Sequence, residues 1–206
     1  MDLTPFDETR AWIHQILRSD AEHILVGHNR RDKSVDDLYR LNLNTGEQDL
    51  LAQNPGDVLT WISDDDGVLR ARIRKFENEE RILEVLQKPA DSWQQMIAWD
   101  MEESVRFLSF TSDNKGMWLL SNRKHDRIGL VRLDLETGKE KLIYQDPAVD
   151  LELVSISYLT KEPVLAATFP DYQKLHFFNK EVEALSETFR TRQPVNLSLA
   201  SSNNEY

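Results

Sequence analysis

Residues 38–47 read LYRLNLNTGE, and residues 130–139 read LVRLDLETGK. The two stretches are identical at six of ten positions, and their glycines, Gly46 and Gly138, lie 92 positions apart. Each stretch alternates inward and outward residues before a Thr-Gly turn, and this period of two is typical of a β-strand with one buried face. The glycine supplies the positive φ that a tight hairpin needs. The repeat therefore predicts an all-β fold built from similar hairpins.

A shorter period underlies this repeat. Apolar strand openings recur with spacings of 46, 47, 48 and 42 residues, and Ser/Asp/Asn/Gly turn clusters separate the strands within each unit. A period of about 40–50 residues, with four short strands in each unit, is typical of a β-propeller blade. The openings are at Trp12, Val58, Val105, Leu153 and Val195.

The predicted fold class is all-β: a β-propeller segment of about four four-stranded blades, an incomplete fifth blade and one short helical insert. The whole chain, residues 1–206, forms this partial propeller. Its units are expected to start near residues 11, 58, 105 and 152, with the incomplete unit beginning at residue 194. No hydrolase domain is predicted within these residues.

The helical insert is predicted in unit four. Asn179 is a good helix N-cap, and Glu181 and Glu183 place acidic charge in the first turn, where the helix dipole favours it. Apolar residues then follow at helical spacing on one face. They are Val182, Leu185 and Phe189.

Three segments depart from regular blades. Unit two is expected to replace the Thr-Gly hairpin with a longer connection around residues 88–93, and residues 1–6 are interpreted as the last outer strand of a preceding blade. The chain stops after one strand and one turn of the fifth unit. Because unpaired strand edges promote aggregation, we expect a segment of a longer protein. The alternative is a complete four-bladed propeller with ragged ends.

The composition excludes several classes of function. The formal net charge of −11 disfavours nucleic acid and anionic lipid as partners. The absence of cysteine excludes disulfides, thiolate metal sites and cysteine nucleophiles. No apolar run reaches the roughly 18–20 residues of a membrane-spanning helix, and the first residues do not form a signal peptide. The compartment stays open, with a cytoplasmic location favoured slightly over a periplasmic one.

No catalytic, cofactor-binding or metal-binding residues are predicted. The glycines, at positions 27, 46, 56, 67, 116, 129 and 138, fit neither G-x-S-x-G, G-x-G-x-x-G nor a P-loop. The five histidines form neither H-E-x-x-H nor a close pair. The run of three aspartates before Gly67 lacks the acid that a calcium loop requires at Ile62, so it is interpreted as a solvated hairpin turn.

Other short motifs carry structural interpretations. The Gly-His and Trp-Asp dipeptides of WD40 blades begin at Gly27 and Trp99, too far apart for one blade. The tryptophans are expected to pack mostly between blades. A glycosylation acceptor match at Asn196 falls on a predicted strand.

Two acidic pairs could bind a cationic group such as a peptide amino terminus. They are Glu79–Glu80 and Glu102–Glu103. An exposed acidic turn is the favoured interpretation of both pairs, because charged residues are mostly surface residues. The substrate-binding residues stay unknown.

In their order along the chain, six phrases resemble the N-terminal propeller of prolyl oligopeptidase-family (S9) serine peptidases. The resemblance is strongest to the acylaminoacyl-peptidase and dipeptidyl-aminopeptidase-like branch, and it covers about residues 2–200. The phrases are DLTPFDETRAWI (2–13), DAEHILVGHNRRD (20–32), DLYRLNLNTGE (37–47), NPGDVLTWISDDDG (54–67), LVRLDLETGKE (130–140) and FFNKEVEALSETF (177–189).

The resemblance implies a non-catalytic propeller that caps an α/β-hydrolase domain with a Ser-Asp-His triad and admits peptides but not folded proteins. The implied partners are that hydrolase domain and the remaining blades of the same polypeptide, and the peptides that pass the propeller. No triad residue and no amine-binding acid pair carries over to this chain, and no cofactor is implied.

Two alternatives to a peptidase propeller remain at this stage. One is a free-standing propeller that scaffolds other proteins, and the other is a truncated gene product without function. A G-x-S-x-G motif downstream in the reading frame favours the peptidase. A stop codon after a closing blade favours the scaffold.

We predict that the 206 residues alone hydrolyse no peptidyl or aminoacyl ester, because they encode neither a nucleophile elbow nor an oxyanion hole. The measurement is an ester hydrolysis assay on the purified chain. Hydrolysis that persists through rigorous purification would contradict this prediction.

Overall fold

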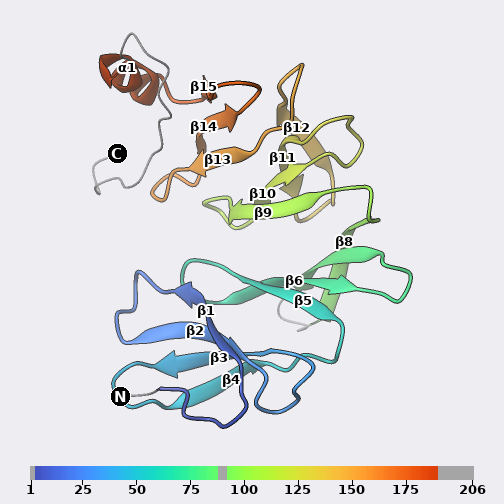
Figure 1. Cartoon of the computed structure of the whole chain (residues 1–206), viewed down its shortest axis with the longest axis vertical. Helices are drawn as coiled ribbons and strands as arrows, with labels where there is room; N and C mark the ends of the chain where they lie inside the picture. Colours follow the sequence, from blue (N-terminus) through green and yellow to red (C-terminus); the bar gives the residue numbers. More distant parts are fainter. Residues whose placement is uncertain (1–2, 88–91, 190–206) are drawn as a thin grey trace. The chain divides into compact units, whose positions relative to one another are not determined.

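The computed structural model describes residues 3–87 and 92–189. The chain divides into two compact units, Met1–Asp100 and Met101–Tyr206, and each unit is described by itself. Among the described residues there are fifteen strands and one helix (Figure 1).

The first unit contains two four-stranded antiparallel sheets in which each strand pairs with its neighbours in sequence. The strands of the first sheet are β1 (Ala11–Ile16), β2 (His23–His28), β3 (Asp37–Asn42) and β4 (Gln48–Ala52). The strands of the second sheet are β5 (Val58–Ser63), β6 (Leu69–Lys75), β7 (Arg81–Gln87) and β8 (Ser92–Trp99).

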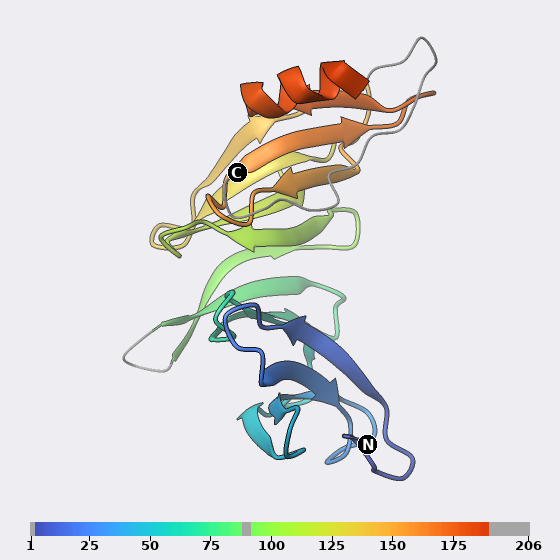
Figure 2. The same cartoon turned by 90° about the vertical axis from the view of Figure 1, so that its left-hand side faces the viewer.

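The second unit has a four-stranded sheet, a three-stranded sheet and the helix, which follows β15 (Figure 2). The four-stranded sheet consists of β9 (Val105–Phe110), β10 (Gly116–Ser121), β11 (Gly129–Asp134) and β12 (Glu140–Tyr144). The three-stranded sheet consists of β13 (Leu153–Ile156), β14 (Pro163–Thr168) and β15 (Lys174–Phe177), and the helix is α1 (Lys180–Phe189).

This series of antiparallel sheets with one short helix confirms the predicted fold class. The sheets begin at Ala11, Val58, Val105 and Leu153. That they form a single partial propeller domain stays a prediction. The expected fifth unit, from residue 194, lies outside the described residues, as do the candidate glycosylation site and Val195.

The helix starts where the sequence predicts. Oδ1 of Asn179 accepts hydrogen bonds from the backbone N–H groups of Glu181, at 2.9 Å, and Val182, at 3.2 Å. These bonds satisfy two of the N–H groups that the first turn leaves without helical partners. Asn179 is thus confirmed as the N-cap. Leu185, on the expected apolar face, is exposed.

The two Thr-Gly turns are built alike. Gly46 and Gly138 have φ of 77° and 67°, as predicted. In each turn the side chain four residues before the glycine stabilises the loop. Oδ1 of Asn42 accepts from Thr45 N at 3.0 Å, and Oδ1 of Asp134 accepts from Thr137 N at 2.8 Å. The turn is therefore held by an Asx side chain as well as by its glycine.

Two other turns depend on polar side chains, and the second of them differs from expectation. In the turn before β10, the positive φ of 55° belongs to Asn114 and not to Gly116, which lies in the strand. Asparagine tolerates this conformation because its short polar side chain bonds locally. Asp64 is buried, so the hairpin after β5 is not fully solvated. Oδ1 of Asp64 accepts from Val68 N at 2.9 Å, and Arg70 pairs with Oδ2 at 2.7 Å.

The prediction of one buried face on the repeated strand is wrong. On β3, Leu38 and Leu41 point to opposite faces and both are buried; on β11, Leu130, Val131 and Leu133 are all buried. Alternate residues of a strand face opposite sides of the sheet. These middle strands are therefore covered on both faces, whereas the sequence pattern indicated a covered face and an open one.

Within each unit, a hydrophobic cluster joins the two sheets. In the first unit, Leu25 and Leu38 pack with Val58 and Trp61 of the second sheet. In the second unit, Trp118 packs with residues of both sheets, and its Nε1 donates to Lys161 O at 2.6 Å. The expectation that tryptophans pack between blades is met by Trp61 and Trp118. Trp12, on the edge strand β1, is 40% exposed.

Two predicted segments need correction. Residues 3–6 form no strand; instead Leu3 packs beside Ile24, Val26 and Leu41, and no neighbouring strand in the described chain pairs with it. The connection predicted around residues 88–93 extends too far, because β8 begins at Ser92, which pairs with Gln87. Residues 88–91 lie outside the described residues.

Within the ranges 3–87 and 92–189, no helix combines the length and the apolar character needed to cross a membrane.

We predict that Leu38→Ala lowers the free energy of unfolding by about 2–4 kcal/mol, because it leaves a cavity in the cluster that joins the first two sheets. Leu50→Ala is the matched control: it is the same substitution in the same sheet, at a side chain that is 52% exposed. It should cost about 0.5 kcal/mol or less. Urea denaturation of both variants measures the difference, and equal losses would contradict the packing described above.

Candidate functional site

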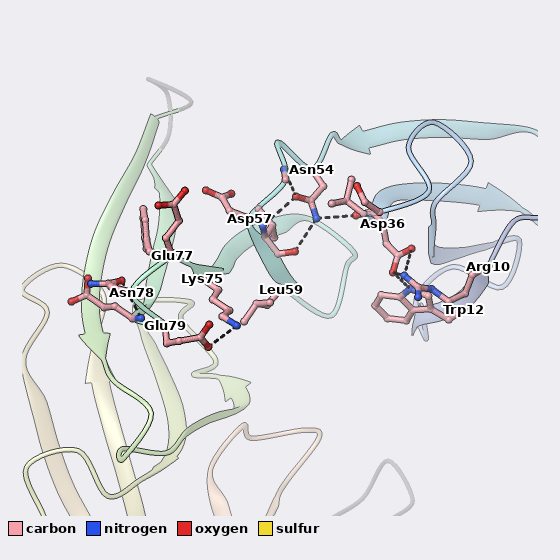
Figure 3. Close-up of a pocket in the computed structure, with 16 residues that line it drawn as sticks. Arg10, Trp12, Asp36, Asn54, Asp57, Leu59, Lys75, Glu77, Asn78 and Glu79 are labelled. Atoms are coloured by element: carbon pink, nitrogen blue, oxygen red, sulfur yellow. Dashed lines mark hydrogen bonds and ion pairs between the residues drawn. The ribbon is translucent and has the colours of Figure 1, made fainter.

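A hollow of about 1020 Å³ opens in the first unit, where the two sheets meet (Figure 3). Four segments line it: the start of β1, the loop between β2 and β3, the connection from β4 to β5, and the hairpin between β6 and β7. In an antiparallel sheet these segments lie at the same end of the strands, so residues far apart in sequence meet there.

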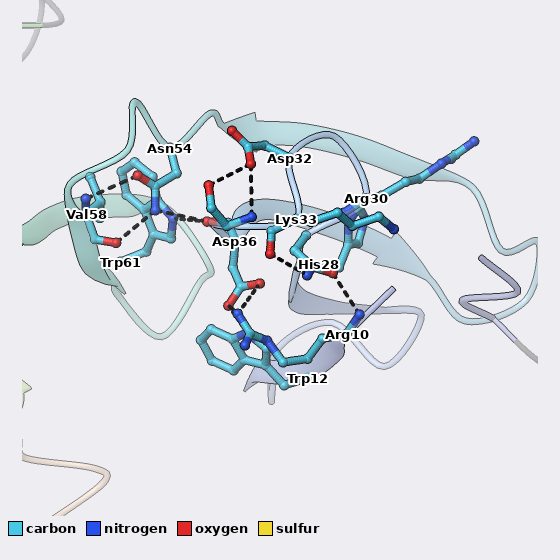
Figure 4. A network of polar contacts seen from close by, with 12 residues as sticks. Arg10, Trp12, His28, Arg30, Asp32, Lys33, Asp36, Asn54, Val58 and Trp61 are labelled. Atoms are coloured by element: carbon cyan, nitrogen blue, oxygen red, sulfur yellow. Dashed lines mark hydrogen bonds and ion pairs between the residues drawn. The ribbon is translucent and has the colours of Figure 1, made fainter. Parts of the chain in front are cut away.

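Asn54 organises the connection between the two sheets. Its Oδ1 accepts from Gly56 N at 2.9 Å and from Val58 N at 3.1 Å, while Nδ2 donates to Val58 O at 2.8 Å and to Asp36 O at 3.3 Å (Figure 4). The side chain is buried. A buried amide with its bonds satisfied fixes the backbone around it. Asn54 thereby ties the β2–β3 loop to the first residue of β5.

One wall of the hollow is a cluster around Asp36. A guanidinium nitrogen of Arg10, Nη2, donates to both carboxylate oxygens of Asp36, at 3.0 and 3.1 Å, and Trp12 Nε1 donates to Oδ2 at 3.3 Å (Figure 4). The indole also covers Gly27, where an added Cβ would lie 2.6 Å from the ring. Trp12 is thus held by a hydrogen bond on one edge and by the bare glycine beneath it.

The opposite wall is the hairpin between β6 and β7. Phe76 N donates to Glu80 O at 2.9 Å, and Glu79, with φ of 67°, completes the reversal. Lys75 Nζ pairs with Glu79 Oε2 at 2.6 Å. Glu77, on the same hairpin, is exposed. In the described part of the chain, no ion pair or side-chain hydrogen bond involves the carboxylates of Glu77 and Glu80.

Asp57 lies between these walls. Arg74 Nε donates to its Oδ2 at 3.0 Å, and a second guanidinium nitrogen contacts the same oxygen. These bonds lower the pKa of the Asp57 carboxyl below its ordinary value of 3.8, against the opposing effect of partial burial. The other oxygen, Oδ1, is buried and has no hydrogen-bond partner among the described residues.

The charge of the lining is negative. Two cations, Arg10 and Lys75, are each already paired with an acid of the wall. An apolar surface lies between them, with the side chain of Leu59 51% exposed. The carboxylates are those of Asp36, Asp57, Glu77, Glu79 and Glu80. Such a hollow can attract a cationic group and cover apolar surface beside it.

The lining offers no nucleophile with a base. Ser34, its single serine, donates from Oγ to Asp32 Oδ1 at 2.6 Å, and no histidine takes part in the lining. Over residues 3–87 and 92–189, no group of three or more His, Asp or Glu side chains could hold a metal ion. The residues that line the hollow therefore supply no nucleophile paired with a base.

The histidines have structural surroundings. His28 is buried, stacks on Tyr39 with ring centroids 3.9 Å apart, and contacts Gln48 Oε1 through Nε2 at 2.9 Å. In the second unit, His176 stacks on Tyr144 with centroids 3.8 Å apart. Burial lowers the pKa of His14. The imidazole of His14 also lies against Trp12, with ring centroids 5.3 Å apart, so these three rings pack against neighbouring aromatic side chains.

Of the two acidic pairs singled out in the sequence, one lines the hollow. Glu79 and Glu80 are on its hairpin wall, whereas Glu102 and Glu103 do not line it. Sequence reasoning missed Arg10, Asp36 and Asn54, which come from separate chain reversals. Their one local signal is the Asn-Pro-Gly-Asp turn at residues 54–57.

In sequence, the chain is similar to part of a dipeptidyl aminopeptidase. No protein-family model matches the chain. Dipeptidyl aminopeptidase BIII of Pseudoxanthomonas mexicana is 26% identical over 181 residues, which cover 78% of this chain and 25% of that protein. The chain therefore spans about a quarter of the length of the curated relative it matches.

Two solved structures share the fold. TolB from Acinetobacter baumannii matches with a TM-score of 0.52 and 16% identity, over 76% of this chain and 38% of that one. A structure from a study of two prolyl endopeptidases matches with a TM-score of 0.51 and 13% identity, over 78% and 28%. At these identities the two matches support the fold alone.

We predict that Asp57→Asn lowers the free energy of unfolding by about 1 kcal/mol at about pH 7, because it removes one of the two carboxylates that pair with Arg74, the other being that of Glu84. Since the pKa of Asp57 is lowered by folding, its contribution is complete above the ordinary carboxyl value and is lost as the pH falls through the lower folded value. The difference between the two proteins should therefore shrink as the pH falls below the ordinary carboxyl value of 3.8.

Urea denaturation at several pH values measures this difference. Glu77→Gln serves as the control, because it removes an exposed carboxylate of the same hollow without breaking an ion pair. It should leave the free energy of unfolding nearly unchanged across the range. A loss in Asp57→Asn that stays constant down to about pH 2 would show that the ionised carboxylate is not what stabilises the fold.

Proposed function

We propose that this chain, whose sequence and fold are similar to the propeller of prolyl oligopeptidase-family serine peptidases, is the propeller portion of such an enzyme and controls which peptides reach its active site. The resemblance seen in the sequence is confirmed by the dipeptidyl aminopeptidase relative and by the shared fold. The narrower acylaminoacyl-peptidase resemblance stays a prediction.

The observation that carries the proposal is the extent of the sequence match. It extends over 181 residues at 26% identity and covers more than three quarters of this chain. The relative is a peptidase by its name, and this chain corresponds to a quarter of it. We propose that an α/β-hydrolase domain and further blades of the same polypeptide accompany this chain, and that peptides are the substrates.

The physical basis of the proposed control is steric. A propeller that covers a catalytic serine limits access by the size of the opening and keeps bulk water away from the reacting bond. The sheets of each unit are joined by close-packed apolar clusters such as that of Leu38 and Trp61. Close packing resists gradual deformation. Loosening one of these clusters is therefore expected to widen the range of substrates.

We predict that the intact protein containing this chain reacts with a fluorophosphonate probe of catalytic serines. It should hydrolyse a dipeptidyl anilide and a short peptide but not casein. Leu38→Ala should raise the ratio of kcat/KM for the short peptide to kcat/KM for the dipeptidyl anilide by about threefold or more, because it loosens the packing of two sheets. Leu50→Ala, at an exposed position, should leave this ratio unchanged.

The same experiment separates the alternatives. Absence of fluorophosphonate labelling in the intact protein would favour a free-standing propeller scaffold over a peptidase. Labelling together with an unchanged ratio in Leu38→Ala would retain the peptidase and refute control by the propeller. Circular dichroism and the thermal midpoint of each variant establish that the assays compare folded proteins.

A further inference from the structure

We propose that the hollow between the first two sheets binds the basic side chain of a polypeptide, above all an arginine, with a neighbouring apolar residue of the same peptide against Leu59 and Trp12. This inference goes beyond the proposed function, because it concerns a side chain of the ligand and requires no hydrolase domain. Three independent features of the hollow carry it.

The first feature is a surplus of negative charge that the protein itself does not neutralise. Arg10 is paired with Asp36, and Lys75 is paired with Glu79. In the described residues, the carboxylates of Glu77 and Glu80 have no such partner, although both residues line the hollow. A guanidinium can donate to two carboxylates at once and carries its charge at any physiological pH. The unpaired acids therefore match an arginine side chain.

The second feature is apolar surface in the same hollow. Leu59 is 51% exposed and Trp12 is 40% exposed, although Trp12 lies in β1 and Leu59 lies in β5. The hollow, at about 1020 Å³, is larger than one side chain and is open to solvent along an edge. Charge beside apolar surface fits a peptide segment better than a small inorganic cation.

The third feature is that the walls are already fixed without a ligand. Asn54 ties the β2–β3 loop to the start of β5 through its bonds to Asp36 O and Val58 O (Figure 4). Trp12 donates to Asp36 and covers Gly27. Asp57 adds a buried carboxylate oxygen, Oδ1, that lacks a hydrogen-bond donor among the described residues. A site that is ordered beforehand loses less entropy on binding.

The test uses the intact protein and two capped peptides, Ac-Ala-Leu-Arg-Leu-Ala-NH2 and the same peptide with citrulline in place of arginine. Citrulline keeps the shape of arginine and removes its charge. If fluorophosphonate labels a catalytic serine, that serine is blocked before the measurement. Isothermal calorimetry then measures peptide binding without hydrolysis. We expect the citrulline peptide to bind about tenfold more weakly, as for the loss of a charge-assisted hydrogen bond.

The variant Glu77→Gln/Glu80→Gln should weaken binding of the arginine peptide by about fivefold and leave the citrulline peptide unaffected. The matched control is Glu102→Gln/Glu103→Gln, which removes the same charge from an acidic pair that does not line the hollow. It should change neither affinity. Added salt should weaken the binding of the arginine peptide more than the binding of the citrulline peptide.

The proposal is overturned if the arginine peptide does not bind, if citrulline binds equally well, or if the hollow variant and the control variant behave alike. Binding only by an uncapped peptide would assign the site to an amino terminus instead and would also overturn it. None of these outcomes depends on fluorophosphonate labelling or on the substrate ratio. The peptidase proposal and the binding proposal can therefore fail separately.

Discussion

Leu38 and Leu41 lie on the same strand, point to opposite faces of the sheet, and are both buried. A strand covered on both faces requires a packed layer on each side, which is how the middle strands of stacked sheets differ from those of an open sheet. Leu38 meets the second sheet through Val58 and Trp61, and Leu41 is covered by residues that include Leu3. This two-sided burial holds the first unit together.

The hollow is a consequence of that packing. The packed cluster holds the two sheets together, and the loops at the ends of their strands leave space between them. Asn54 lies in the connection between the two sheets and bonds Asp36 O of the β2–β3 loop and Val58 O of β5. The charged side chains around it belong to the loops, where contact with solvent stabilises ionised carboxylates. The core therefore supplies rigidity, and the loops supply the chemistry.

The charges of the hollow differ in what they do. Arg10 with Asp36 and Arg74 with Asp57 hold segments of the wall in place. Glu77 and Glu80 make no comparable contact among the described residues and are available to a ligand. A propeller of a peptidase that also engages a basic side chain would favour some peptides over others before they reach the catalytic serine. Selection would then involve charge as well as size.

The amino-acid sequence by itself determined the all-β class, the blade-like period, the helix beginning after Asn179 and the likeness to a peptidase propeller, because these depend on local pattern and on motif order. Only the tertiary structure decided that β3 is buried on both faces, and that Trp12 and Asp36 meet the hairpin of Glu79 around one hollow. A local pattern records how residues alternate along one strand. It does not show which loops from distant parts of the sequence come to lie beside that strand in the folded protein.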